Sequence, residues 1–219
     1  MQLENLNFSG IMNQIKSLKP DLIKIIQILR NREINLYDVK LNKADAQFEF
    51  LKQCGKEFQN LIVVQTKGDG NCFYNAISLC LFGSQEYCNI LRLVTVFIFV
   101  ENEQYMRNLI SSTYGEKKFN QFLVDISKNY NWANEYEIHA MSIALNRAIN
   151  VFSVNEVNKI FLSMNYYAHD CQLKKKCVSI VHRKDHFSAL MPISFDVKFP
   201  NISGNQFYKY KIKTFKNYE

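Results

Sequence analysis

The chain contains 219 residues, a length that suits one domain or one domain with an added helical extension. Hydrophobic residues make up 47% of the chain and only 3 residues are proline, so low-complexity disorder is excluded. The net charge of +7 would suit a nucleic-acid partner, but most of the lysines are scattered along the sequence. We therefore interpret the charge as a solvated basic surface and do not expect nucleic acid as a partner.

The six cysteines argue against a disulfide scaffold and against a zinc module. No Cys-x-x-Cys pair occurs among them, so we expect neither a metal nor any other cofactor. Scattered free thiols fit a reducing compartment. The N-terminus lacks the pattern of an export signal, and the longest apolar run, residues 93–100, is too short to cross a bilayer. A cytosolic protein is expected, and delivery into a host cytosol as an effector stays open.

The first part of the chain predicts helices and one short strand. Pro20 marks the start of a clear helix, because an apolar stripe at helical spacing follows it. Residues 6–19, before the proline, are only weakly amphipathic. The predicted elements are a helix over 21–30, a loop over 33–43, a helix over 44–59 and a strand over 61–65.

The middle of the chain predicts a buried helix that begins beside a glycine-broken loop. Residues 71–82 have apolar residues at helical spacing, and Gly83 is placed to end this helix. Cys72 therefore falls in the first turn, where unpaired N–H groups and the helix dipole favour negative charge. Residues 93–100 are β-branched and apolar, so propensity predicts a buried strand there. Helices over 103–112 and 116–130 follow.

The last part of the chain predicts one helix and four strands. A helix over 135–147 follows Trp132, which we expect to be a packing anchor, and Glu137 is expected to brace the start of that helix. The predicted strands cover 149–154, 159–167, 177–182 and 186–192, and a turn at 183–185 joins the last two as a hairpin. This order predicts an α/β (α+β) domain with a small sheet between helices.

Cys72 and His186 are the residues that point most strongly to chemistry. A cysteine that opens a helix after a glycine-broken loop is what a thiol nucleophile requires, because the thiolate attacks and both the helix N-terminus and a nearby imidazolium lower the pKa of the thiol. The pairing of such a cysteine with a distant histidine is typical of cysteine hydrolases. The alternative is an inert core thiol, which is the interpretation we give to Cys80.

Three stretches, in the same order as in a known family, strengthen this interpretation. They read GDGNCFYNA at 68–76, WANEYEIHA at 132–140 and KDHFSAL at 184–190. Together they resemble the ovarian-tumour (OTU) family of deubiquitinating cysteine proteases, over roughly residues 57–195. The resemblance implies a papain-like fold with a small central sheet sandwiched between helices. Residues 1–56 would form an N-terminal helical extension and residues 196–219 a basic C-terminal segment.

The resemblance also implies an activity and a site. Such an enzyme cuts the isopeptide bond after the C-terminal Gly-Gly of ubiquitin, with Cys72 as nucleophile and His186 as general base and acid. The oxyanion loop would be formed by Gly68, Asp69, Gly70 and Asn71. Ser188 stands where the family usually has the Asn or Asp that orients the histidine. The Ser188 hydroxyl can accept from the ring, or the orienting group comes from elsewhere, for example Asp69, or the enzyme works with a loose Cys-His dyad. The expected partners are ubiquitin and polyubiquitin chains, with a ubiquitin-like modifier left open.

Two other functions remain open on the residues alone. A hydroxyl at position 188 brings no charge to the imidazole, which suggests a catalytically weak or inactive OTU-like module that binds ubiquitin. A nucleic-acid binder driven by charge is the second alternative, and no recognised motif supports it.

Overall fold

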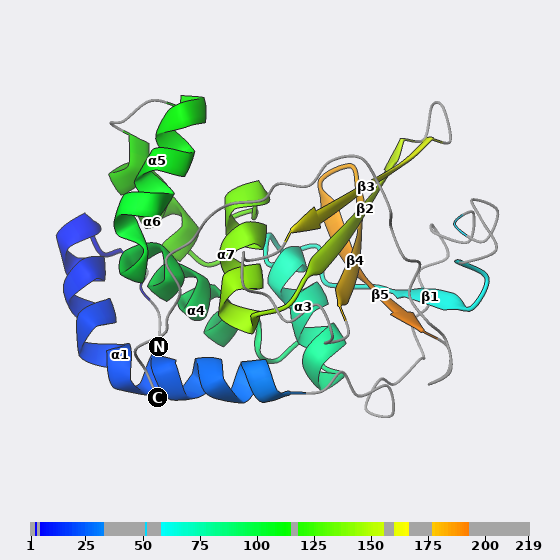
Figure 1. The fold of residues 1–219 in the computed structure, drawn as a ribbon, viewed down its shortest axis with the longest axis horizontal. Coiled ribbons are helices and arrows are strands. Elements are labelled where there is room, and N and C mark those ends of the chain that lie inside the picture. The colour runs from blue at the N-terminus through cyan, green and yellow to red at the C-terminus, as the bar shows by residue number, and fades with distance from the viewer. Residues whose placement is uncertain are drawn as a thin grey trace.

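The computed structural model describes residue 3 and residues 5–32, 51, 58–114, 118–155, 160–166 and 177–192 (Figure 1). The helix predicted over 44–59 lies outside the described residues except for Leu51, Phe58 and Gln59, and Leu51 is helical and buried. The basic segment 196–219 and the lysine cluster at 174–176 also lie outside them.

Helix α1 spans Phe8–Asn31, so the predicted start at Asp21 is wrong. Pro20 lies inside the helix, where it removes one backbone hydrogen bond, and Figure 1 shows α1 bent along its length as a proline in a helix interior requires. The helix continues through the proline because its apolar stripe is buried on both sides of it. The buried residues are Ile11, Ile15, Leu22, Ile26 and Leu29.

Helix α4 spans Cys88–Glu101 and replaces the strand that propensity predicted over 93–100. Every residue from Leu91 to Val100 is buried, so the segment meets the core on all sides and shows no polar face. In such a position packing decides the conformation, and the weak preference of β-branched residues for strands is overridden. This helix contacts α1, α3, α6 and α7 and forms the centre of the helical part.

The other helices agree with the predictions to within a few residues. They are α3 (Cys72–Phe82), α5 (Glu103–Tyr114), α6 (Phe119–Ser127) and α7 (Glu135–Leu145). Gly83 ends α3 in the left-handed conformation, as predicted. Glu137 braces the start of α7 in a capping box with Asn134, which confirms its expected role. No helix in the described ranges is both long and apolar enough to cross a membrane.

The five strands form one mixed sheet in the order β1-β5-β4-β2-β3. They are β1 (Leu61–Val64), β2 (Ile149–Asn155), β3 (Ile160–Tyr166), β4 (Val178–Arg183) and β5 (His186–Pro192). The β2–β4 pair is parallel and the other pairs are antiparallel. The predicted hairpin is present, and His186 opens its second strand opposite Arg183.

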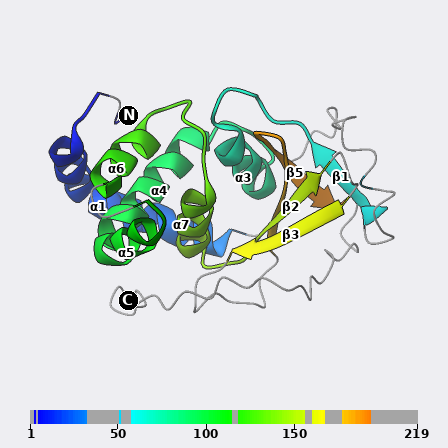
Figure 2. The same ribbon diagram turned by 90° about the horizontal axis from the view of Figure 1, so that it is seen from above.

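Both faces of the sheet are buried. Helix α3 packs on β5 and β4, where Phe73 meets Phe187 edge to face at 5.7 Å, and this face joins the main core (Figure 2). On the opposite face Phe152 packs edge to face on Phe58 at 5.5 Å. The predicted α+β class is therefore confirmed.

Helix α1 belongs to the same core as the rest of the described chain. Its buried residues pack with those of α4, α6 and α7. At its C-terminal end, Arg30 donates to the carbonyl oxygens of Ala144 and Ile143 at the end of α7, and Arg147 donates back to the Arg30 carbonyl. These contacts join the ends of two helices that are more than 100 residues apart in the sequence.

Candidate active site

Cys72 is the first residue of α3, and its side chain is only 4% exposed. The preceding residue, Asn71, gives the helix no side-chain cap, so its side chain does not compete for the N–H groups of the first turn. Burial is the largest influence on the thiol and raises its pKa, while the N–H groups of Phe187 and Phe73 act in the opposite direction. The net direction for the thiol pKa is upward because burial is the largest influence, opposite to the lowering expected from the helix N-terminus.

The loop of Gly68, Asp69, Gly70 and Asn71 is fixed by its own hydrogen bonds. The Asp69 carboxylate accepts from the Asn71 N–H at 3.0 Å and from the Asn75 side chain at 3.2 Å. Gly70 has φ +78°, and a Cβ built there would lie 1.9 Å from the Tyr130 carbonyl oxygen. Only glycine fits this position, because both the backbone conformation and the close approach exclude a side chain.

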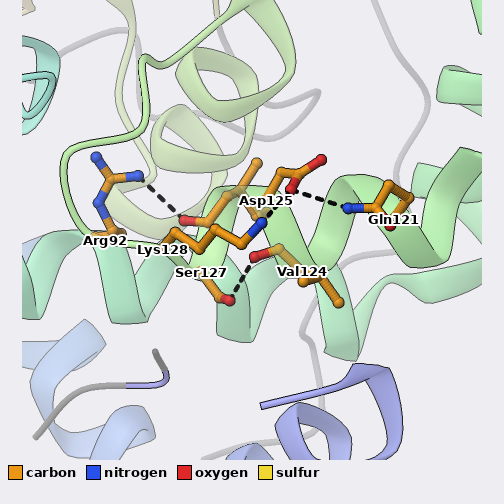
Figure 3. A network of polar contacts seen from close by, with 7 residues as sticks. Arg92, Gln121, Val124, Asp125, Ser127 and Lys128 are labelled. Atoms are coloured by element: carbon orange, nitrogen blue, oxygen red, sulfur yellow. Dashed lines mark hydrogen bonds and ion pairs between the residues drawn. The ribbon is translucent and has the colours of Figure 1, made fainter. Parts of the chain in front are cut away.

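A buried arginine ties this loop to its neighbours. One Nη of Arg92 donates to the carbonyl oxygens of Gly70 and Asn131 and to the Asn71 side chain, at 3.3, 2.7 and 2.7 Å. Its other Nη donates at 3.1 Å to the carbonyl oxygen of Ile126, near the C-terminal end of α6 (Figure 3). A guanidinium suits this task, since its planar fork reaches several acceptors at once.

The same arginine belongs to a buried polar cluster behind the loop. Its guanidinium lies 4.3 Å from the centre of the Tyr74 ring, and the Tyr74 hydroxyl donates to Glu137 at 3.4 Å. Burial raises the pKa of Glu137 to about 7, while the Asn134 N–H and Arg92 act against this rise. The buried carboxyl therefore connects the start of α7 to the packing behind Cys72.

His186 stands across from this loop at the start of β5. A Cβ built on Gly68 would lie 4.0 Å from Cε1 of the imidazole, so the loop and the ring are neighbours. The Phe187 N–H, one residue further, points to the Cys72 sulfur and favours its thiolate. The start of β5 and the cysteine loop, more than 100 residues apart in the sequence, are therefore neighbours: the His186 ring lies beside Gly68, and the Phe187 N–H reaches the Cys72 sulfur.

Asp69 and Ser188, the two residues expected to orient the His186 ring, make other contacts or none in the described part of the chain. Asp69 bonds to the loop and to α3, as described above. Ser188 is fully buried, and its hydroxyl has no hydrogen-bond partner in the described part of the chain. The hydrogen bond of the His186 ring goes instead from Nε2 to the hydroxyl of Thr66, at 3.1 Å.

Thr66 and Arg92 are residues that the sequence analysis missed. Arg92 had a usable signal, since a single charge inside an apolar helix must be paired when it is buried. Thr66 had a weaker one, a β-branched hydroxyl residue between a strand and the loop. Trp132 was predicted to be a packing anchor, but it is 59% exposed because the backbone around Asn131, and not the indole, packs on the loop.

The remaining candidates have structural roles. Cys80 is buried, and its thiol donates to the Ser179 carbonyl oxygen. His139 bonds to the Tyr105 hydroxyl at 2.9 Å, and burial lowers its pKa to about 4. Among the residues with described positions, no three His, Cys, Asp or Glu side chains gather where they could hold a metal.

Comparison with known proteins agrees with this geometry. The profile of the "OTU-like cysteine protease" family matches residues 67–188, more than half of the chain. OTU domain-containing protein 1 of Homo sapiens is 25% identical over 174 residues, which cover 78% of this chain and 33% of that protein. The chain thus corresponds to about a third of that relative's length.

Solved structures show the same fold at low sequence identity. The OTU domain of OTUD1 aligns with a TM-score of 0.55 and 22% identity, over 66% of this chain and 91% of that one. The Hazara virus OTU bound to ubiquitin aligns with a TM-score of 0.50 and 20% identity, over 63% and 85%. With the family profile spanning the Cys72 loop and reaching Ser188, the chain belongs to the family of OTU-like cysteine proteases.

Proposed function

We propose that this chain is a deubiquitinase that hydrolyses the isopeptide bond after the C-terminal Gly-Gly of ubiquitin. The observation that supports the proposal is that the Phe187 N–H, next to His186 on β5, reaches the sulfur of Cys72 at the start of α3, while the His186 ring lies beside Gly68 of the cysteine loop. Ubiquitin and polyubiquitin chains are the proposed partners, since a solved relative with this fold is bound to ubiquitin. A reducing cytosol is the proposed compartment, in agreement with the free thiols of Cys72, Cys80, Cys88 and Cys177.

In the first step the thiol must lose its proton as it attacks. Burial raises the pKa of Cys72, so the resting thiol is not ionised in advance and needs a base. His186 takes this proton as the sulfur bonds to the carbonyl carbon of the last ubiquitin residue. The Phe187 N–H, which already favours the thiolate, stabilises the charge as it forms.

The carbonyl oxygen becomes negative as the bond to sulfur forms, and it needs hydrogen-bond donors. The Asn71 N–H is occupied by Asp69, whereas the Cys72 N–H, at the first residue of α3, lies beside the Cys72 sulfur itself. The Cys72 N–H is therefore the donor we assign to the oxyanion, and Arg92 holds the loop that positions it. Donors fixed before the reaction stabilise such charge most effectively.

The bond to the lysine nitrogen then breaks. His186 returns its proton to this nitrogen, and the lysine amine leaves while ubiquitin remains bound to Cys72 as a thioester. A water molecule, deprotonated by His186, attacks the thioester and releases the ubiquitin carboxylate and the free thiol.

A ubiquitin derivative with a C-terminal electrophile tests the assignment directly. We expect the wild-type protein to form a covalent adduct at Cys72, identified by mass spectrometry, and Cys72→Ala to form none. A Cys80→Ala variant is the matched control and should still be labelled, since the Cys80 thiol is buried in the core and bonded to the Ser179 carbonyl oxygen. Wild-type protein that neither reacts with the probe nor cleaves any type of ubiquitin chain would contradict the proposal.

An inactive ubiquitin-binding module is the alternative, and it is favoured by the Ser188 hydroxyl, which has no partner among the described residues. It predicts that ubiquitin binds without turnover and that Ser188→Asn or Ser188→Asp gains activity. Appreciable cleavage by the wild type would remove this alternative.

A further inference from the structure

We propose that Thr66 is the residue that orients the imidazole of His186. Thr66 lies just after β1, six residues before Cys72, and its side chain is buried. Its hydroxyl oxygen lies 3.1 Å from Nε2 of His186 and 2.5 Å from the carbonyl oxygen of Phe187. One hydroxyl therefore contacts both the ring and the backbone of the next residue.

The hydrogen atoms of this arrangement can be assigned from chemistry. A carbonyl oxygen only accepts, so the single hydroxyl hydrogen of Thr66 points to the Phe187 oxygen. The threonine oxygen can then only accept from His186, and Nε2 must carry a proton. In the neutral ring the lone pair is consequently on Nδ1, which is the nitrogen left to take the proton of a thiol.

The surrounding backbone holds Thr66 in place from both sides. The β1–β5 register pairs Val64 with Ala189, and two further steps bring Thr66 opposite Phe187. Gln85 then bridges the neighbours of Thr66, since its side chain accepts from the Lys67 N–H at 2.9 Å and donates to the Gln65 carbonyl at 3.5 Å. Thr66 is therefore a fixed acceptor and not a freely rotating surface hydroxyl.

Ser188, the residue expected from the sequence, is in a different situation. It lies on β5 two residues after His186 and is fully buried, yet its hydroxyl bonds to nothing in the described chain. The group that orients the ring is therefore supplied by the segment that leads into the cysteine loop, and not by the strand that carries the histidine. The hydroxyl of Thr66 carries no charge, so it selects a tautomer and an orientation but adds little to the stability of an imidazolium.

The state of the ring can be measured without ubiquitin. Long-range ¹H–¹⁵N NMR correlations distinguish the two neutral tautomers, and His186→Gln identifies the signals of this ring. We expect wild-type His186 to carry its proton on Nε2 above the pH at which the ring is protonated. Thr66→Val has the same shape without the hydroxyl and should yield a mixture of tautomers, whereas Thr66→Ser should keep the wild-type pattern.

Turnover of a fluorogenic ubiquitin substrate supplies the second readout, and this part rests on the proposed function. Thr66→Val should lower kcat by about tenfold or more with little change in KM, because a mispositioned base affects the chemical step and not binding. Thr66→Ser should recover most of the rate. Ser142→Ala, which also removes a buried hydroxyl bonded to a backbone carbonyl, is the control for a general loss of packing.

The outcomes separate the two proposals. A proton on Nδ1 in the wild type, or a folded Thr66→Val variant with wild-type tautomer and kcat, would overturn the role of Thr66. A larger loss of kcat in Ser188→Ala than in Thr66→Val would overturn it as well. If the tautomer shifts in Thr66→Val but the wild type turns over no ubiquitin substrate, the role of Thr66 stands and the proposed activity falls.

Discussion

The two sides of the candidate site are held with very different numbers of contacts. On the cysteine side, the loop 68–71 and the first turn of α3 are fixed by Asp69 and by Arg92. On the histidine side, within the residues that the structure describes, the ring of His186 is hydrogen-bonded to the hydroxyl of Thr66 alone, and the nearby Ser188 hydroxyl makes no bond. Donors for an oxyanion must not move as charge develops, whereas a base must rotate slightly to pass its proton on.

The prediction with the largest effect concerns the cysteine side. Arg92→Met removes four hydrogen bonds, three of them buried, and leaves the carbonyl oxygens of Gly70, Ile126 and Asn131 without this partner. We expect a loss of about 3–5 kcal/mol in the free energy of unfolding, measured with urea. Lys24→Met is the control for loss of a surface cation, because that lysine pairs with Asp21 where both side chains are exposed, and it should cost about 1 kcal/mol or less. Equal losses in both variants would contradict the difference between the two sides.

The same comparison explains which parts of the site could be predicted from sequence. The Cys72 helix, its Gly83 stop and the hairpin that presents His186 depend on local patterns, and all three are confirmed. The orienting contact of Thr66 depends on strand register between segments 120 residues apart, so neither neighbouring sequence specifies it. Ser188 was chosen by its spacing from the histidine, and spacing alone does not fix the direction of a hydroxyl.

In the fold as well, elements that depend on local patterns were predicted correctly and elements that depend on long-range packing were not. Strand propensity suggested 93–100 as a strand, but α4 is surrounded by core on every side, and the identity of its neighbours cannot be read from its own residues. Pro20 suggested a helix start, but packing of α1 on α4, α6 and α7 outweighs one missing hydrogen bond. Local rules failed where long-range packing contributed more free energy than the local preference.

The next prediction tests how tightly the loop is packed. Gly70→Ala places a Cβ against the Tyr130 backbone at a residue with φ +78°. We expect a loss of about 2–3 kcal/mol in the free energy of unfolding and a lower kcat, because the loop must move to admit the methyl group. In Gly10→Ala the nearest atoms lie at an ordinary 3.4 Å inside α1, so this control should be neutral or slightly stabilising. A Gly70→Ala protein as stable as Gly10→Ala would show that the loop is not rigid.

A third prediction concerns Glu137, the buried carboxyl behind the cysteine loop, and the change of stability with pH that it causes. The pKa of Glu137 rises from 4.5 to about 7 on folding, so between these values the folded state binds the proton and the unfolded state releases it. Stability from this group is complete below about pH 4.5 and is lost as pH rises through about 7. Glu137→Gln keeps the capping box but cannot titrate.

The measurement is the difference in unfolding free energy between wild type and Glu137→Gln across this pH range. We expect the variant to gain about 1–2 kcal/mol relative to wild type from pH 5 to pH 7.5. Taking the difference cancels His139, whose pKa, lowered to about 4, makes stability change in the opposite direction. A constant difference would mean that Glu137 is already ionised throughout, with Arg92 outweighing its burial.

The smallest effect is expected at the exposed rim of the cysteine side. Tyr130 and Trp132 are 62% and 59% exposed, and the backbone of Tyr130 and Asn131 is bonded to Asn71 and Arg92, so both residues flank the loop that precedes the nucleophile. Large exposed aromatics in such a place are suited to an extended polypeptide, and Trp132→Ala should raise KM for a ubiquitin substrate by about three- to tenfold. Alkylation of Cys72 by iodoacetamide should keep its rate, since that reagent is too small to need the ring. Ile28→Ala removes an equally exposed apolar side chain on α1 and should change neither quantity. If Trp132→Ala slowed alkylation as much as turnover, the indole would be needed to hold the cysteine loop in place. The set of residues that fix the loop would then include this exposed ring as well as Asp69 and Arg92.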